Sequence, residues 1–122
     1  MNFNSLILPA TKKDNMISRG RASGGLGIFW KNMFNSSVKQ INIPNSNRVQ
    51  AICIYNKTLI LNCYFPCDSQ DNNFDDWELI KCLEEISGVI LDHPNHEVII
   101  SGDLNCDFSS NSPFVNTVRD FI

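Results

Sequence analysis

One stretch of this chain, from about Phe74 to Leu91, repeats its apolar residues at steps of three and four. That spacing places them along one face of an α-helix and predicts that this face is buried. The apolar residues that share the expected face are Trp77, Ile80, Leu83, Ile86, Val89 and Ile90. Asp75 and Asp76 fall in the first turn, where the helix dipole favours negative charge. The fold must therefore supply an apolar surface for this helix to cover.

Short apolar runs bounded by turn residues lie on both sides of this helix and predict strands. The runs lie at residues 4–8, 26–30, 38–43, 49–54, 58–64 and 98–100. Residues 55–57 are expected to close a hairpin, residues 35–37 to form a turn, and residues 98–100 to be a compact buried strand. Pro113 is expected to begin a last helix. The order strands, helix, strand, helix predicts an α/β protein whose sheet is covered on at least one side.

A core of this kind needs cover on the second face of the sheet as well, and the chain offers little that could supply it. With 122 residues there is room for one domain. A hydrophobic fraction of 43% and a charged fraction of 19% are those of a globular protein and argue against disorder. We therefore expect a single domain over residues 1–122 that lacks part of its cover.

Charge and cysteine content limit the function classes. A net charge of -3 gives no general basic field for DNA, RNA or an anionic membrane, so any nucleic-acid role needs a local site. The apolar runs are too short to span a bilayer, and the N-terminus lacks the basic region of a signal peptide. Five cysteines without paired spacing indicate reduced thiols. An intracellular protein of the nucleus or cytoplasm, with no membrane partner, is the expectation.

The most informative motif is Ile99-Ile100-Ser101-Gly102-Asp103-Leu104-Asn105, in which a strand runs into a glycine. Loops at such strand ends are where α/β proteins place reacting groups. On an extended segment Asp103 and Asn105 would share one face while Leu104 packs inward. A carboxylate beside a carboxamide can orient a water or bind Mg²⁺ through oxygen. Gly-Asp-x-Asn is also a good turn sequence, and on spacing alone the turn interpretation is favoured.

Two further segments have a functional and a structural interpretation. Tyr64 ends a strand just before Phe65-Pro66, where a half-buried aromatic with its hydroxyl in water is the ordinary reading. Gly24-Gly25 precedes the strand at 26–30, and glycine pairs can let a backbone approach phosphate. This segment matches neither the dinucleotide nor the Walker A pattern, so a flexible loop entering a strand is favoured locally.

Taken in order, these segments resemble the endonuclease/exonuclease/phosphatase superfamily. They are Arg-Ala-Ser-Gly-Gly-Leu-Gly-Ile before a strand, Leu-Asn-Cys-Tyr-Phe-Pro at the end of a later one, a helix, and then Ile-Ile-Ser-Gly-Asp-Leu-Asn. Within the superfamily the chain looks most like the apurinic-type endonuclease domain of non-LTR (LINE-type) retrotransposons. The resemblance covers nearly the whole chain and implies part of an α/β sandwich, with a mixed, mainly antiparallel sheet and covering helices.

The resemblance also implies roles for three residues. Asp103 matches the family aspartate that orients or deprotonates the attacking water, and Asn105 matches the asparagine that holds the phosphate near the metal. Tyr64 matches the tyrosine whose hydroxyl contacts the scissile phosphate. The implied reaction is hydrolysis of a phosphodiester with Mg²⁺, or Mn²⁺ in its place, bound in part by Asp103 and Asn105. DNA is the implied partner, together with a reverse transcriptase domain in a longer polyprotein.

Several family features are not found in this sequence. The N-terminal strands with an asparagine and a metal-binding glutamate would precede Asn4, and the terminal Ser-Asp-His segment would follow Ile122. The resemblance therefore implies the central part of the domain, expected to be inactive alone because magnesium would have an incomplete oxygen set. Two alternatives stay open: a non-catalytic, domesticated or decayed fragment, and a superfamily member that acts on another phosphoester.

The remaining candidates are weaker. Cys63 and Cys67 could be drawn with His93 and His96 as a zinc site, but the spacing fits no standard finger, so no zinc is expected. The two histidines are expected to be solvated turn residues. An acidic group is explained by loop solvation and helix N-terminal charge; it comprises Asp68, Asp71, Asp75 and Asp76. The one basic stretch comprises Lys12, Lys13, Arg19 and Arg21, of which Arg19 and Arg21 are the candidates for contact with a DNA backbone.

Overall fold

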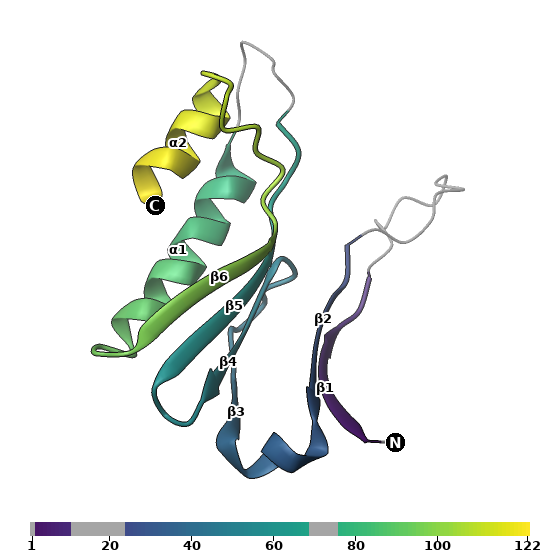
Figure 1. Ribbon diagram of the computed structural model, residues 1–122. Helices are drawn as coiled ribbons and strands as arrows, with labels where there is room; N and C mark the ends of the chain where they lie inside the picture. Colours follow the sequence, from purple (N-terminus) through teal and green to yellow (C-terminus); the bar gives the residue numbers. More distant parts are fainter. Residues whose placement is uncertain (1, 11–23, 69–75) are drawn as a thin grey trace.

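The computed structural model describes residues 2–10, 24–68 and 76–122 (Figure 1). Six strands, two α-helices and one 3₁₀-helix make up these residues. In chain order they are β1 (Phe3–Leu8), β2 (Leu26–Lys31), the 3₁₀-helix η1 (Asn32–Ser37), β3 (Val38–Ile41), β4 (Val49–Ile54), β5 (Thr58–Tyr64), α1 (Trp77–Leu91), β6 (Glu97–Asp103) and α2 (Pro113–Phe121). The α/β class is confirmed, and η1 stands where a turn at 35–37 was predicted.

The strands form two separate sheets. One has four strands in the order β3-β4-β5-β6, with β6 parallel to β5 and the other pairs antiparallel. The other is the antiparallel pair β1-β2. The predicted β4–β5 hairpin is confirmed, and its central residues Tyr55 and Asn56 both have positive φ, 54° and 51°. Two positive φ values are the signature of a type I′ turn, which matches the twist of the flanking strands.

Both helices cover the same face of the four-stranded sheet (Figure 1). Alternate residues of β5, namely Leu59, Leu61 and Cys63, point into this layer and are fully buried. From α2, Phe114 and Val118 complete the same core. The predicted start of α2 is confirmed, because Pro113 is its first residue and the Ser112 side chain accepts a hydrogen bond from the Val115 N–H.

The prediction for α1 was partly wrong. The helix begins at Trp77 with Asp76 as its N-cap, so Asp76 precedes the first turn and Glu78 is the acidic residue within it. Trp77 and Ile80 are 61% and 37% exposed. The buried residues of the helix are Leu79, Cys82, Leu83, Ile86 and Val89. Two overlapping stripes have helical spacing here, and the sheet covers the one that includes the small, readily buried Cys82.

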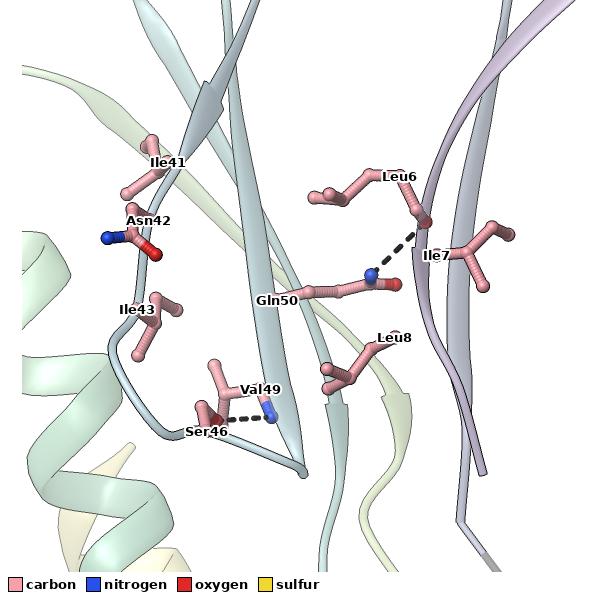
Figure 2. Close-up of a pocket in the computed structure, with 9 residues that line it drawn as sticks. All are labelled: Leu6, Ile7, Leu8, Ile41, Asn42, Ile43, Ser46, Val49 and Gln50. Atoms are coloured by element: carbon pink, nitrogen blue, oxygen red, sulfur yellow. Dashed lines mark hydrogen bonds between the residues drawn. The ribbon is translucent and has the colours of Figure 1, made fainter. Parts of the chain in front are cut away.

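The second face of the sheet carries the β1–β2 hairpin, so the chain itself supplies part of the cover that was expected to be lacking (Figure 1). The hairpin is attached through side-chain amides. Gln50, which is only 5% exposed, donates from Nε2 to the Leu6 carbonyl at 3.2 Å, and Asn62 donates to the Gly27 carbonyl at 3.3 Å. Figure 2 shows Gln50 reaching across from β4 towards β1, at the edge of a cavity of about 130 Å³ with Ile41 and Leu8 in its lining.

The expectation of a buried strand at 98–100 was wrong. In β6, Val98 is 39% and Ile99 is 50% exposed. The strand lies at the edge of the four-stranded sheet, and the contacts of the hairpin are with β4 and β5. An apolar sequence predicts that a strand is buried, but the strand is buried only where other elements of the tertiary structure cover it. Within the described residues, no helix is long and apolar enough to cross a membrane.

Candidate functional site

Tyr64 and Asp103 are direct partners at the carboxyl ends of the parallel strands β5 and β6. Partners in register point to the same face of a sheet, so both side chains lie on the face that carries the hairpin. Asp103 is exposed and Tyr64 is half-buried. The structure therefore brings together two of the three residues that the sequence proposed for catalysis, although they are 39 positions apart in the chain.

Gly102 makes this arrangement possible. Its φ is +114°, a conformation that L side chains rarely adopt, and a Cβ atom there would lie 2.1 Å from the Cys63 carbonyl oxygen. No other residue fits against the neighbouring strand at this point. The sequence reading of this glycine as a conformational pivot at the strand end is confirmed.

The side chain of Asn105, the third predicted residue, is hydrogen-bonded to the residue that follows β5. Its Nδ2 donates to the Phe65 carbonyl at 2.6 Å, while its backbone N–H donates to Asp103 Oδ1 at 3.0 Å. The second bond makes residues 103–105 an Asx turn, and Asn105 has a positive φ of 48°. The extended arrangement of Asp103 and Asn105 was therefore wrong and the turn interpretation is confirmed. Leu104 packs against the core, as predicted.

Arg48 is a neighbour of Tyr64 that the sequence reading did not single out. Its guanidinium donates to the Tyr64 carbonyl at 3.1 Å and lies 5.3 Å from the centre of the Tyr64 ring. It also pairs with Glu78 of α1 at 3.3 Å. These contacts hold the tyrosine at its carbonyl and its ring and place a guanidinium, itself paired with Glu78, beside it. In the sequence, Arg48 is an isolated residue before an apolar strand, so no local pattern could have identified it.

A cavity of about 220 Å³ lies beside the Asx turn. Its lining comprises Cys67, Asp68, Asn105, Asp107, Ser110 and Val115. Hydrogen bonds from Ser109 lower the pKa of Asp107, and Ser112 Oγ donates to Asp68 Oδ2 at 2.5 Å. Asn105 is the one predicted site residue in this lining. Tyr64 and Asp103 instead face the hairpin side, so the cavity and the candidate site are neighbours joined by Asn105.

The oxygen atoms at the end of β6 suit a hard divalent cation in type. A magnesium ion takes one or two protein carboxylates and keeps several waters. The Asp103 carboxylate is exposed, and Asn105, whose amide nitrogen is engaged by Phe65, has its carbonyl oxygen as a second donor. In the described ranges, no group of three or more His, Cys, Asp or Glu residues could hold a metal ion. These two oxygens match magnesium in chemical type, and they are two donors of the larger ligand set that the ion takes.

The residues of the alternative zinc grouping lie at opposite ends of the parallel strand pair. His93 and His96 precede Glu97, which pairs with Thr58, whereas Cys63 pairs with Gly102. Burial raises the pKa of the Cys63 thiol to about 12. His93 Nδ1 lies 2.7 Å from the Val89 carbonyl, which places it as a partner for the end of α1.

Arg19 and Arg21, the candidates for contact with a nucleic-acid backbone, lie outside the described residues. Gly24 and Gly25 have φ values of 85° and 95°, which bend the chain as it enters β2. Comparisons with protein-family models, curated proteins and solved structures found no match for this chain.

Proposed function

We propose that this chain is part of a Mg²⁺-dependent phosphodiester hydrolase, of the DNA-nicking type that its motifs resemble. The observation that supports the proposal is the convergence of Tyr64 and Asp103, as register partners, with Asn105 tied back to β5 beside them. Tyr64 is far in the sequence from Asp103 and Asn105. The paired ends of β5 and β6 give the three residues a common location. The same proposal includes the fold: the α/β sheet and its helices would be part of an endonuclease/exonuclease/phosphatase sandwich.

The chemistry assigned to each residue follows from its surroundings. Asp103 carries an exposed carboxylate whose Oδ1 already accepts the Asn105 N–H, so the turn holds the group in one orientation for a water. Tyr64 offers a hydroxyl donor to a phosphate oxygen, and the guanidinium of Arg48, which also pairs with Glu78, lies beside its ring. A bound Mg²⁺ would stabilise charge on the phosphate oxygens. Asp103 and Asn105 are the residues that would hold it.

Manganese binding tests the proposal without requiring activity. Mn²⁺ added to the ¹⁵N-labelled chain should broaden the amide signals of Asp103 and Asn105 first, at millimolar concentration because the ligand set is partial. Asp103→Asn should abolish this selective broadening. Asp120→Asn removes an exposed carboxylate on α2 and should leave it unchanged. Uniform broadening at all exposed carboxylates would contradict a site at the end of β6.

The substrate class needs a second titration. With Mg²⁺ present, a short DNA duplex should shift the Tyr64 and Asp103 signals, and an inositol phosphate should not. The reverse result would favour a superfamily member that acts on a soluble phosphoester. Strong nicking of supercoiled plasmid by the chain alone, lost in Asp103→Ala, would show that the chain carries a complete site, against the expectation of inactivity.

A second candidate function, a non-catalytic interaction module, is favoured by the outer face of the β1–β2 hairpin. Phe3, Ile7 and Phe29 lie on that face and are 54%, 53% and 66% exposed. Exposed apolar patches mark interaction surfaces. Concentration-dependent oligomerisation that is lost in Phe29→Ser, with no Mn²⁺ selectivity at Asp103, would favour this module over the hydrolase.

A further inference from the structure

Asn62 lies where three separate segments of the sequence meet. It is on β5, in register with Gln50 of β4 on one side and Ser101 of β6 on the other. Its side chain therefore points to the face that carries the hairpin, one row before Tyr64 and Asp103. On the same face, the row on the other side of Asn62 is apolar: Ile52, Ile60 and Ile99 are in register there.

The nitrogen of Asn62 attaches the hairpin to the sheet. Nδ2 donates to the Gln50 side-chain oxygen at 2.9 Å and to the Gly27 carbonyl at 3.3 Å, which uses both of its hydrogens. Gln50 in turn donates to the Leu6 carbonyl at 3.2 Å. The two amides thus engage both hairpin strands, β1 through Leu6 and β2 through Gly27.

The oxygen of Asn62 lies on the side of Gly102. A Cβ built at Gly102 would lie 2.9 Å from Asn62 Oδ1, so this oxygen lies in the space that a side chain at residue 102 would need. Gly102 is the pivot from which Asp103 and the Asx turn follow. One side chain therefore donates to Gly27 of β2 with its nitrogen and places its oxygen next to the glycine of the Gly-Asp-Leu-Asn motif.

We propose that Asn62 is a positioning residue that fixes the Gly102–Asn105 turn relative to the β1–β2 hairpin. The side chain does not reach the reacting groups itself. It sets the distance between the layer that bears β2 and the strand end that bears Asp103. The link between hairpin and turn is independent of the reaction, whereas its value for metal binding rests on the proposed hydrolase function.

The test compares Asn62→Leu with Ile60→Ala in the ¹⁵N-labelled chain. Leucine keeps the size of asparagine but has no donor or acceptor, so the signals of Gly27 and of Asp103 and Asn105 should all shift. Ile60→Ala weakens packing on the same strand and face, two residues earlier, and should lower the unfolding midpoint without moving the Asp103 and Asn105 signals. Gln40→Glu, an exposed amide change on β3, should move neither set.

Hydrogen exchange measures how strongly Asn62 holds the hairpin on the sheet. Loss of the Asn62 hydrogen bonds should speed exchange of the β1–β2 ladder amides by about tenfold, while exchange in the helix-covered core changes little. The proposal is overturned if Asn62→Leu leaves the Asp103 and Asn105 signals in place, or if Ile60→Ala shifts them equally, since the effect would then be general destabilisation.

Manganese binding separates this proposal from the proposed function. If wild type shows selective broadening at Asp103, Asn62→Leu should weaken it about tenfold, and Ile60→Ala should not. If wild type shows none, the hydrolase proposal fails, but the shifts at Gly27 and Asp103 still decide whether Asn62 links the two layers.

Discussion

The two faces of the four-stranded sheet are held in opposite ways. On the helix side, Leu59, Leu61 and Ile86 are fully buried and the contact is mainly apolar, with the Glu85 carboxylate beside the Cys63 and Cys82 thiols as an exception. On the hairpin side, side-chain amides of Gln50 and Asn62 bridge the layers, and Ile99 remains half exposed. Apolar contact is tolerant of small shifts, while hydrogen bonds fix direction and distance. The helix face thus buries most of the core, and the hairpin face is attached by directional hydrogen bonds next to the candidate site.

The largest effect should come from Leu61→Ala on the helix face. Leu61 is 0% exposed, and such truncations cost roughly 2–5 kcal/mol of unfolding free energy because a cavity remains. Urea denaturation followed by circular dichroism measures this loss. Ile60→Ala, its neighbour on the hairpin face, should cost less. Equal losses at the two positions would break the comparison between the faces.

Gly102→Ala should have the next largest effect. The added methyl group would meet the Cys63 carbonyl oxygen and the positive φ would be strained, at a cost of about 1–3 kcal/mol or more. The strand pair β5–β6 should loosen at its carboxyl end, which hydrogen exchange at Phe65 can detect because its N–H donates to the Asp103 carbonyl. Unchanged exchange there would show that the turn is not anchored at Gly102.

Gln50→Leu should sharpen the comparison, because it removes the amide that reaches Leu6 and leaves the Leu6 carbonyl without that donor. We expect a loss of about 1–2 kcal/mol, concentrated in the hairpin. Hydrogen exchange should accelerate in β1 and β2 and stay constant in α1. Uniform acceleration across both layers would mean that they unfold as one cooperative unit.

Alkaline pH should weaken the helix face selectively. Burial raises the pKa of Cys63 to about 12 and that of Cys82 to about 11, from the ordinary thiol value of 9.0. Above pH 9 the unfolded chain loses these protons first, so stability is complete below pH 9 and falls as pH rises towards 12, by about 1 kcal/mol per pH unit for each thiol. Denaturation at pH 8 and pH 10 measures the slope, and Cys82→Ala should reduce it.

Local patterns were sufficient for most of the fold. The strands from β1 to β5 and the start of α2 follow from alternation, turn residues and the proline at position 113, which are short-range effects. The buried side of α1 followed only in part: Leu83, Ile86 and Val89 are buried as predicted, but Leu79 and Trp77 both fit a helical repeat. The sheet selects Leu79 and leaves Trp77 exposed.

The candidate site also has features that the sequence predicted and features that only the tertiary structure shows. The Gly-Asp-Leu-Asn segment indicated a strand end with a glycine pivot and a turn, and both are properties of adjacent residues. The approach of Tyr64 to Asp103 depends on the parallel register of β5 and β6, and the contact of Arg48 with Tyr64 depends on β4 lying beside β5. Strand pairing is a long-range choice, so no spacing along the chain could reveal these contacts.

The sequence by itself determined the α/β class, the position of most elements and the special backbone at Gly102, since propensity, periodicity and positive φ act over a few residues. The tertiary structure alone decided that β1 and β2 form a separate layer, that β6 is an edge strand, and that Asn62 joins the hairpin to the turn. Those outcomes depend on which surfaces meet, because burial and hydrogen bonding between layers are realised only when distant segments pack together.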